Sequence, residues 1–398
     1  MRGSNIGLAL QGGGSYAAFT SGVLKALFDG RRNFLDPARL HSISGTSGGA
    51  LNALLLALSL HEGRRKPTAY VDRFWRLNRM EALLKQRYQA LHMVPESVIA
   101  DLIGMSRNLM STHHRMSGSL GAEASFKSRA MDIVDDLVHF AAPNLTEDVD
   151  AAPLPTRRPF VTVAATEART GVAHFFTSNE RMIRKFEGFE IAAHRHVIRS
   201  LRLRSVYASM AHPMLFDPVH IDDGVYWDGY YTSNPPFVFL FREGCDEVVL
   251  VRLIQQVRDE LGESVAETRD RIEEIVQNTT VNMEIMAYLA MRELLLTSGN
   301  GAEGVDLRLG LQRLRSATVY HEIRLLKPGN IADQGYPLAP FVAKLIDLGR
   351  KAVTDEADGF MAAYARVAPG EQVISEIDFD NATVSSRVID IDHMLFDA

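Results

Sequence analysis

The sequence predicts a three-layer α/β fold, in which a mostly parallel central sheet carries helices on both faces. Two stretches carry this prediction. The apolar run 5–10 ends at glycines 12–14, and apolar residues with helical spacing follow. The run 40–44 leads in the same way into the glycine-rich segment 45–49 and then into an apolar helix. Successive strand-to-helix units are typical of parallel strands covered by helices.

The next part of the chain predicts a helical insertion and then a return to the sheet. Residues 63–144 are largely polar and contain amphipathic segments with helical spacing of their apolar residues. Between these segments, we interpret 105–121, rich in Ser, Met and His, as a loop or lid. The sheet resumes at 159–166. The turn 167–171 predicts a hairpin with 172–177.

Four arginines, Arg195, Arg199, Arg202 and Arg204, are expected on one helix after this hairpin. The later elements that we expect are a hairpin, a buried strand, a long amphipathic helix, a last strand and closing helices, at residues 215–228, 247–252, 272–298, 319–326 and 340–364.

We expect one domain over residues 1–398, with the helical insertion or lid at about 63–144 and a C-terminal helical extension at about 264–398. Hydrophobic residues make up 46% and charged residues 23% of the 398, which excludes intrinsic disorder. The formal net charge of -6 argues against a nucleic-acid partner. The single cysteine, Cys245, and the absence of an apolar run of roughly 18 residues make the cytoplasm the expected location.

The segment 45–49, Gly-Thr-Ser-Gly-Gly, is a G-x-S-x-G motif between a predicted strand and a predicted helix. In that context the serine is a candidate nucleophile, because small residues such as Gly45 and Gly49 allow a sharp turn that exposes the Ser47 side chain. The start of the helix would also favour an anionic oxygen beside Ser47. A serine that merely caps the helix is the simpler interpretation of this motif alone.

Gly12, Gly13 and Gly14 form a second turn between strand and helix. Consecutive glycines allow backbone N–H groups to converge on one point, which suits an oxyanion or a phosphate. Neither G-x-G-x-x-G nor G-x-x-x-x-G-K-[ST] occurs here, so nucleotide binding has weak support. An oxyanion pocket and a plain tight turn both remain open.

Asp228, followed by Gly229, stands at the end of a predicted hairpin strand. A serine hydroxyl needs a neighbouring base to accept its proton. An aspartate with the ordinary pKa of about 4 serves as that base only when burial or fixed geometry favours the transfer. Taken alone, Asp-Gly is a common turn dipeptide.

In this order the three motifs, within residues 7–236, resemble the patatin-like phospholipase family. Members carry a glycine loop that forms the oxyanion hole, a G-x-S-x-G nucleophile and a D-G-[GA] aspartate of a Ser-Asp dyad. Segment 209–213, Ser-Met-Ala-His-Pro, also resembles a block of that family. The resemblance implies a serine lipid acyl hydrolase in which Ser47 attacks an ester, Asp228 accepts its proton, and glycines 12–14 hold the oxyanion. It implies no metal and no organic cofactor.

Two of the motifs depart from the family pattern. The commoner loop reads G-G-G-x-[RK]-G, whereas this chain has Tyr16 at the place of the cation and Ala17 at the place of the fourth glycine. Tyr230 stands where the dyad motif has glycine or alanine. We therefore expect the oxyanion to depend on backbone amides alone, and a bulky side chain to narrow the mouth of the site.

Two alternative functions remain. An esterase or thioesterase of the α/β-hydrolase type, with a Ser-Asp-His triad, needs a histidine after the aspartate. Only His321 and His393 follow Asp228, and isolated histidines are more often core or surface residues. The other alternative is a non-catalytic lipid-binding scaffold of the same fold. The presence of nucleophile, base and glycine loop favours the enzyme.

The expected partner is a lipid or another acyl ester as substrate. Arginines on the helix at 195–204 would suit anionic head groups at a membrane surface, which leaves a peripheral membrane contact open, although such arginines are more often solvated or paired with carboxylates. No metal-binding spacing such as H-E-x-x-H occurs. The sequence carries no prediction of oligomeric state.

Overall fold

A computed structural model gives the fold. It describes residues 5–29, 35–77, 120–145, 157–185, 190–191, 194–195, 197–213, 215–258, 261, 265–298, 319–326, 338–368 and 370–391. The predicted loop or lid at 105–121 therefore lies outside the described residues, except for residues 120 and 121.

Within the described residues, the central sheet has 11 strands. Its main path runs, from one edge to the other, through β13 (Val384–Asp390), β12 (Glu371–Asp378), β11 (Val319–Leu326), β10 (Glu247–Arg252), β1 (Ile6–Leu10), β2 (Leu40–Gly45), β3 (Phe160–Glu167), β4 (Ala173–Thr177) and β7 (Ile198–Ser200). Beside this path, β9 (Gly224–Asp228) pairs with β3 and with β8 (Val219–Ile221). A separate two-stranded sheet consists of β5 (Glu190–Ile191) and β6 (His194–Arg195).

The strands from β12 across to β3 all run parallel to their neighbours. Every residue of β1, β2 and β10 is buried, because the apolar runs that form them are covered on both faces. The carboxyl ends of these parallel strands lie at one edge of the sheet, where α/β proteins commonly build their sites.

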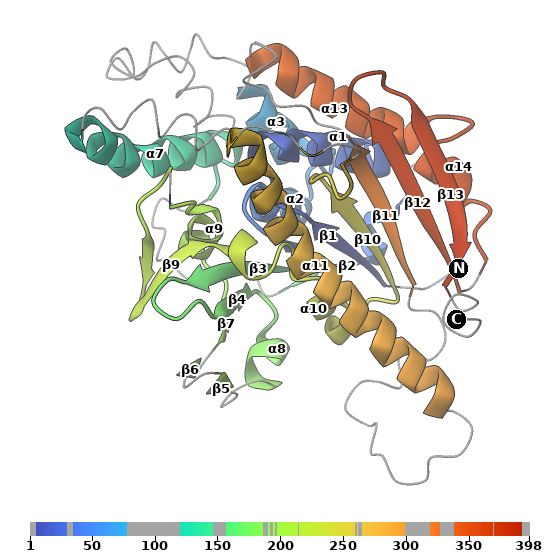
Figure 1. The fold of residues 1–398 in the computed structure, drawn as a ribbon, viewed down its shortest axis with the longest axis horizontal. Coiled ribbons are helices and arrows are strands. Elements are labelled where there is room, and N and C mark those ends of the chain that lie inside the picture. The colour runs from blue at the N-terminus through green and yellow to red at the C-terminus, as the bar shows by residue number, and fades with distance from the viewer. Residues whose placement is uncertain are drawn as a thin grey trace.

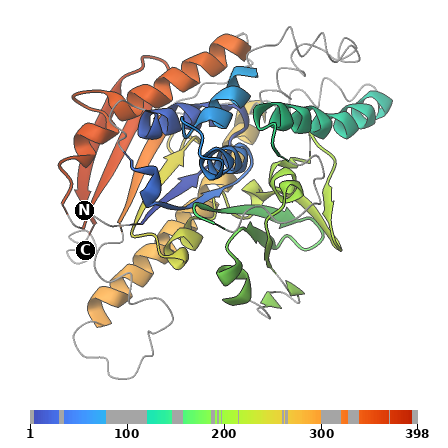
Figure 2. The ribbon, with the colours of Figure 1, turned by 180° about the vertical axis from the view of Figure 1, so that it is seen from behind.

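Helices cover both faces of the sheet, as Figures 1 and 2 show. The largest core cluster joins one face to α1 (Ala17–Phe28), α2 (Gly48–His61), α3 (Ala69–Leu77), α7 (Leu120–Ala141), α9 (Leu203–Met210), α13 (Leu338–Thr354) and α14 (Phe360–Tyr364). Two smaller clusters lie under α8 (Glu180–Lys185), α10 (Phe237–Glu243) and α11 (Val265–Ser298). Short 3-10 turns occur at η1 (Gly14–Tyr16), η2 (Pro37–Arg39) and η4 (Gly229–Tyr231). The three-layer α/β prediction is confirmed.

Helices α1 and α13 cross at very short range. A Cβ atom on Gly22 would lie 2.1 Å from the carbonyl oxygen of Ile346, and one on Gly349 would lie 2.1 Å from that of Phe19. Only glycine permits this approach at either position, because any side chain would overlap the backbone of the other helix. The crossing holds α13 close to the glycine loop, since α1 directly follows η1.

The structure differs from the sequence prediction around the arginines. Arg195 lies in β6 and Arg199 in β7, and α9 begins only at Leu203, so the predicted helix over these positions is wrong. Arg199 pairs with carboxylates of the β8–β9 turn at 3.3 and 3.4 Å. The ion pairs of Arg199 and the pairing of β6 and β7 with neighbouring strands determine the structure here, although the basic residues have helical spacing in the sequence.

The C-terminal region also differs from the prediction. Beyond α11 it adds β11, β12 and β13 to the central sheet, so a helical extension describes only part of residues 264–398. The strand at 319–326 was predicted, whereas β12 and β13 were not. Neither strand has a continuous apolar run or a regular alternation of polar and apolar residues, and β13 is a largely exposed edge strand, so the sequence signal of both is weak.

None of the helices in the described ranges has both the length and the apolar character that a membrane span requires.

Candidate active site

Ser47 lies in the sharp turn between β2 and α2. Its φ of 54° falls in the left-handed region that side chains rarely adopt. The turn is so tight that a Cβ atom on Gly45 would lie 2.5 Å from the carbonyl oxygen of Gly49, and one on Gly49 would lie 2.1 Å from that of Leu10. The predicted glycine positions are therefore those that the turn requires.

The Ser47 side chain does not cap the helix that follows it. Ser47 is the residue before α2, but its hydroxyl accepts no hydrogen bond from the helix amides. Its backbone N–H donates instead to the hydroxyl of Ser209 at 3.0 Å. The interpretation of Ser47 as a simple capping serine thus fails, and its hydroxyl is free to interact elsewhere.

Asp228 ends β9 and is fixed on three sides. Its backbone N–H donates to the Ala211 carbonyl oxygen at 2.9 Å, and its own carbonyl oxygen accepts from the Thr166 hydroxyl at 2.8 Å. Its carboxylate oxygen Oδ1 accepts from the Tyr230 N–H at 2.9 Å. Only 2% of the Asp228 surface is exposed, so hydrogen bonds to protein groups, rather than to water, fix its position.

The structure brings the two predicted residues together, because the Ser47 side chain is close enough to the Asp228 carboxyl group to lower its pKa. Burial raises the pKa of Asp228 to about 7, against the lowering effect of the Tyr230 N–H and the Ser47 hydroxyl. A carboxylate in this environment is a much stronger base than an exposed aspartate.

The glycine loop packs directly on the serine turn. A Cβ atom on Gly12 would lie 2.6 Å from the Thr46 carbonyl oxygen and 2.8 Å from Ser47 Cβ. The Gly12 N–H donates to Asn234 Oδ1 at 2.7 Å, so this amide is already engaged. Within the part of the chain that the structure describes, the N–H groups of Gly13 and Gly14 donate no hydrogen bond.

The three predicted motifs meet around Thr46. Its hydroxyl donates to the carbonyl oxygen of Ser233 at 2.7 Å. A Cβ atom on Gly229 would lie 2.2 Å from the Ala164 carbonyl oxygen and 3.1 Å from Thr46 Cγ2, which explains the glycine after the aspartate. The glycine loop, the serine turn and the aspartate turn therefore form one packed unit.

A family model for the patatin-like phospholipases matches residues 8–241, which is more than half of the 398 residues. The chain belongs to this family. The family match spans all three motifs of the site.

Among solved structures, this patatin-like chain is similar to VipD from Legionella pneumophila, with a TM-score of 0.35 and 15% sequence identity. The similarity covers 87% of this chain and 66% of the VipD chain, so this chain spans just under two thirds of VipD. No curated protein matches the sequence.

Both tyrosines that depart from the patatin-like pattern are buried. Tyr16 is fully covered and packs edge-on against Phe341 of α13, with ring centroids 5.6 Å apart. Tyr230 is 7% exposed and stacks on His212, with ring centroids 5.2 Å apart and an interplanar angle of 6°. Burial lowers the pKa of His212 to about 4, so this imidazole is neutral near pH 7.

The sequence analysis did not identify the residues that hold the patatin-like motifs in place through hydrogen bonds. Gln11 Oε1 accepts from the N–H groups of Leu253 and Ile254, at 2.8 and 3.2 Å, and so ties the glycine loop to β10. Glu284 of α11 accepts from the Ser233 hydroxyl at 2.6 Å. Gln11 and Asn234 lie next to predicted motifs in the sequence, so their supporting role could have been predicted from that position. Glu284 had no local signal, because it lies more than 50 residues after the segment that it supports.

His321, the first of the two histidines considered for the alternative triad, is not placed at the serine. His321 lies in β11, where its Nδ1 accepts from the Val373 N–H at 3.0 Å, and β10, β1, β2 and β3 separate β11 from β9. His393 lies outside the described residues. Within the described ranges no group of three or more His, Cys, Asp or Glu side chains could hold a metal ion.

Proposed function

We propose that this protein is a serine lipid acyl hydrolase that works through a Ser47–Asp228 dyad. The observation that carries the proposal is the approach of the Ser47 side chain to the buried Asp228 carboxyl group, directly beside the glycine loop. The raised pKa of Asp228 supports its role, because a general base works best when its pKa lies near the working pH.

The first half of the reaction forms an acyl-enzyme. Ser47 Oγ attacks the carbonyl carbon of the ester while its proton passes to the Asp228 carboxylate. The carbonyl oxygen becomes an oxyanion, and the N–H groups of Gly13 and Gly14 donate to it. Asp228 then returns the proton to the leaving alcohol as the ester bond breaks.

The second half releases the fatty acid. Water attacks the acyl carbon bound to Ser47 Oγ and gives a proton to Asp228. The tetrahedral intermediate collapses, the acid leaves, and the proton returns to Ser47. The Gly12 amide takes no part in this scheme, because it donates to Asn234; Gly12 serves by allowing the loop to approach Ser47.

The proposal is tested by fatty-acid release from a mixed phospholipid extract, together with labelling by a fluorophosphonate. We expect Ser47→Ala to abolish both release and labelling. Ser59→Ala is the matched control. Ser59 is a buried serine of α2, the helix that follows Ser47, and its hydroxyl donates to the carbonyl oxygen of Lys66, far from the turn. Equal release by wild type and Ser47→Ala would refute the dyad, and a folded wild type that neither releases acid nor takes the label would indicate a non-catalytic scaffold.

A further inference from the structure

Residues 233 and 234 contact all three motifs of the proposed site. The Ser233 N–H donates to the carbonyl oxygen of Gly229 at 2.9 Å, and the Ser233 carbonyl oxygen accepts from the Thr46 hydroxyl at 2.7 Å. The side chain of the next residue, Asn234, accepts from the Gly12 N–H at 2.7 Å. This pair of residues therefore links the aspartate turn, the serine turn and the glycine loop.

The Asn234 side chain lies close to the nucleophile. The Cβ position of Gly12 is 3.1 Å from Asn234 Oδ1 and 2.8 Å from Ser47 Cβ, so a single point is near both side chains. Asn234 is fully buried, which keeps its amide out of water. Electrostatic effects are strong in such an environment, so the charge of the group at this position can affect a reaction at Ser47.

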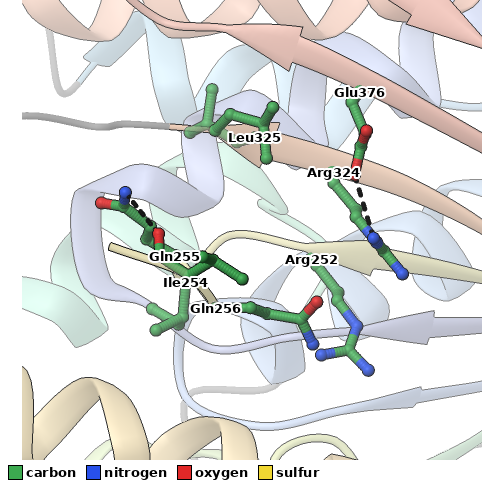
Figure 3. Close-up of a pocket in the computed structure, with 9 residues that line it drawn as sticks. Arg252, Ile254, Gln255, Gln256, Arg324, Leu325 and Glu376 are labelled. Atoms are coloured by element: carbon green, nitrogen blue, oxygen red, sulfur yellow. Dashed lines mark hydrogen bonds and ion pairs between the residues drawn. The ribbon is translucent and has the colours of Figure 1, made fainter. Parts of the chain in front are cut away.

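Two side-chain amides hold the first part of the glycine loop. Gln11 Oε1 accepts from the Ile254 N–H at the end of β10, at 3.2 Å, and Asn234 Oδ1 accepts from the Gly12 N–H. Ile254 also borders the cavity in Figure 3, and its Cδ1 would lie 3.2 Å from a Cβ atom on Gly13. The loop is thus fixed by hydrogen bonds as far as Gly12.

The next two N–H groups of the loop, those of Gly13 and Gly14, are the ones that the proposed mechanism uses. Within the described ranges neither of them donates a hydrogen bond. Glycine has wide conformational freedom, so contacts outside these two residues must determine where their N–H groups point. Because each peptide unit is planar, fixing the Gly12 N–H restricts the orientation of the units that follow.

Asn234 supplies its hydrogen-bond acceptor without a charge. A carboxylate at this position could accept the Gly12 N–H equally well, but it would repel an oxyanion that forms beside Ser47. Asn234 Nδ2 has no hydrogen-bond partner among the described residues. Replacing this NH₂ group by an oxygen atom would therefore break none of the described hydrogen bonds.

We propose that Asn234 is a positioning residue of the reaction, which orients the Gly13 and Gly14 N–H groups through its hydrogen bond to Gly12. The assignment rests on the proposed hydrolase function. The position has two requirements, an acceptor for the Gly12 N–H and the absence of a negative charge.

The first test removes the acceptor. We expect Asn234→Ala to lower kcat for a soluble ester by about 10–100-fold and to leave KM within about twofold, because contacts to the oxyanion are strongest in the transition state. Asn179→Ala is the matched control. Asn179 is another buried asparagine whose Oδ1 accepts a backbone N–H, that of Arg181 at 3.2 Å, but it lies at the start of α8. We expect this control to leave kcat unchanged.

Asn234→Asp tests the charge, and it covers the case in which Asn234→Ala fails to fold. When protonated, the introduced carboxyl group has nearly the shape and the hydrogen-bonding groups of the amide, and burial favours this neutral form. We expect kcat relative to wild type to be within about threefold of one at about pH 5.5 and to fall about 100-fold by about pH 8. This ratio cancels the titration of Asp228, which both proteins share.

Two results would overturn the proposal. One is a folded Asn234→Ala variant with the kcat of wild type. The other is a ratio of kcat between Asn234→Asp and wild type that is the same at both pH values, because a purely structural role of the side chain predicts no change of the ratio with pH.

Hydrogen exchange separates this proposal from the hydrolase function. The Gly12 amide, followed by NMR without substrate, should exchange about tenfold or more faster in Asn234→Ala than in wild type. A wild type that hydrolysed no ester would refute the hydrolase function and with it the catalytic role of Asn234, even if this exchange result were obtained. An active wild type, with unchanged kcat and unchanged Gly12 exchange in Asn234→Ala, would refute only the role of Asn234.

Discussion

Asp228 determines how the proposed chemistry depends on pH. Its pKa is raised to about 7 by burial, and only the ionised carboxylate can accept the Ser47 proton. We expect kcat/KM for a soluble ester to fall tenfold per pH unit below about pH 7 and to level off above it. Asp223→Asn, which changes an exposed turn residue of the same hairpin, should keep this profile. A flat acid limb would exclude Asp228 as the base.

Gly12 tests the contact between the glycine loop and the serine turn. A methyl group there would overlap the Thr46 carbonyl oxygen and Ser47 Cβ, at 2.6 and 2.8 Å. We expect Gly12→Ala to lower kcat by about 100-fold or more, because a displacement of about 1 Å in a catalytic group costs that much.

A surface glycine gives the control for this change. Gly171 has a φ of 70° and nothing near its Cβ position, so Gly171→Ala should cost some stability and leave kcat intact. If Gly12→Ala kept wild-type kcat, the loop would not be part of the site.

At the scale of elements, the crossing of α1 and α13 leaves no room for a single added methyl group. Gly349→Ala would place Cβ 2.1 Å from the Phe19 carbonyl oxygen, which forces the two helices apart. We expect a loss of roughly 2–4 kcal/mol in the free energy of unfolding, measured with urea.

The control for the crossing lies on the same helix. Asp347 is largely exposed, so Asp347→Ala should change the free energy of unfolding by less than about 0.5 kcal/mol. Equal effects of the two substitutions would show that the crossing has little importance for stability.

The sequence predicted elements well where the apolar runs are continuous and buried. β1, β2 and β10 and the hairpins β3–β4 and β8–β9 were all predicted, because glycine turns or Asp-Gly turns bound them. The long α11 was predicted from six apolar residues, of which all but Leu289 prove to be exposed, whereas a largely different stripe packs on the sheet. The exposed residues are Ile272, Ile275, Val276, Met283 and Met286, and the packed ones are Val281, Ile285 and Tyr288.

This difference has a physical cause. Helical periodicity shows that an amphipathic helix forms, but when two stripes are apolar it does not show which of them meets the rest of the protein. The same limit applied to the site. The motifs located Ser47, Asp228 and the glycines, while the contact of Glu284 with Ser233 depends on how distant strands and helices come together.

At the scale of the whole molecule, buried carboxyl groups link stability to pH. Burial raises the pKa of Glu243 to about 7, as it does for Asp228. Both groups hold their protons more tightly in the folded chain than in the unfolded chain. They therefore reduce the free energy of unfolding as pH rises from about 4 to about 7, and the reduction is complete above that range.

Replacing Glu243 isolates this effect. We expect Glu243→Gln to be more stable relative to wild type at pH 8 than at pH 5, by roughly 1–3 kcal/mol in urea unfolding. The sign follows because the neutral amide never has to bury a charge. A difference that is the same at both pH values would show that Glu243 keeps an ordinary pKa in the folded protein.

The most direct measurement is the detection of the acyl-enzyme. Wild-type protein is mixed with a short-chain phospholipid, quenched in acid within the first turnover, digested and analysed by mass spectrometry. We predict one acyl group on the peptide that contains Ser47, present in wild type, absent in Ser47→Ala, and strongly reduced in Asp228→Asn. Turnover of the lipid with the acyl group on another residue, or full acylation of Ser47 in Asp228→Asn at the wild-type rate, would contradict the dyad.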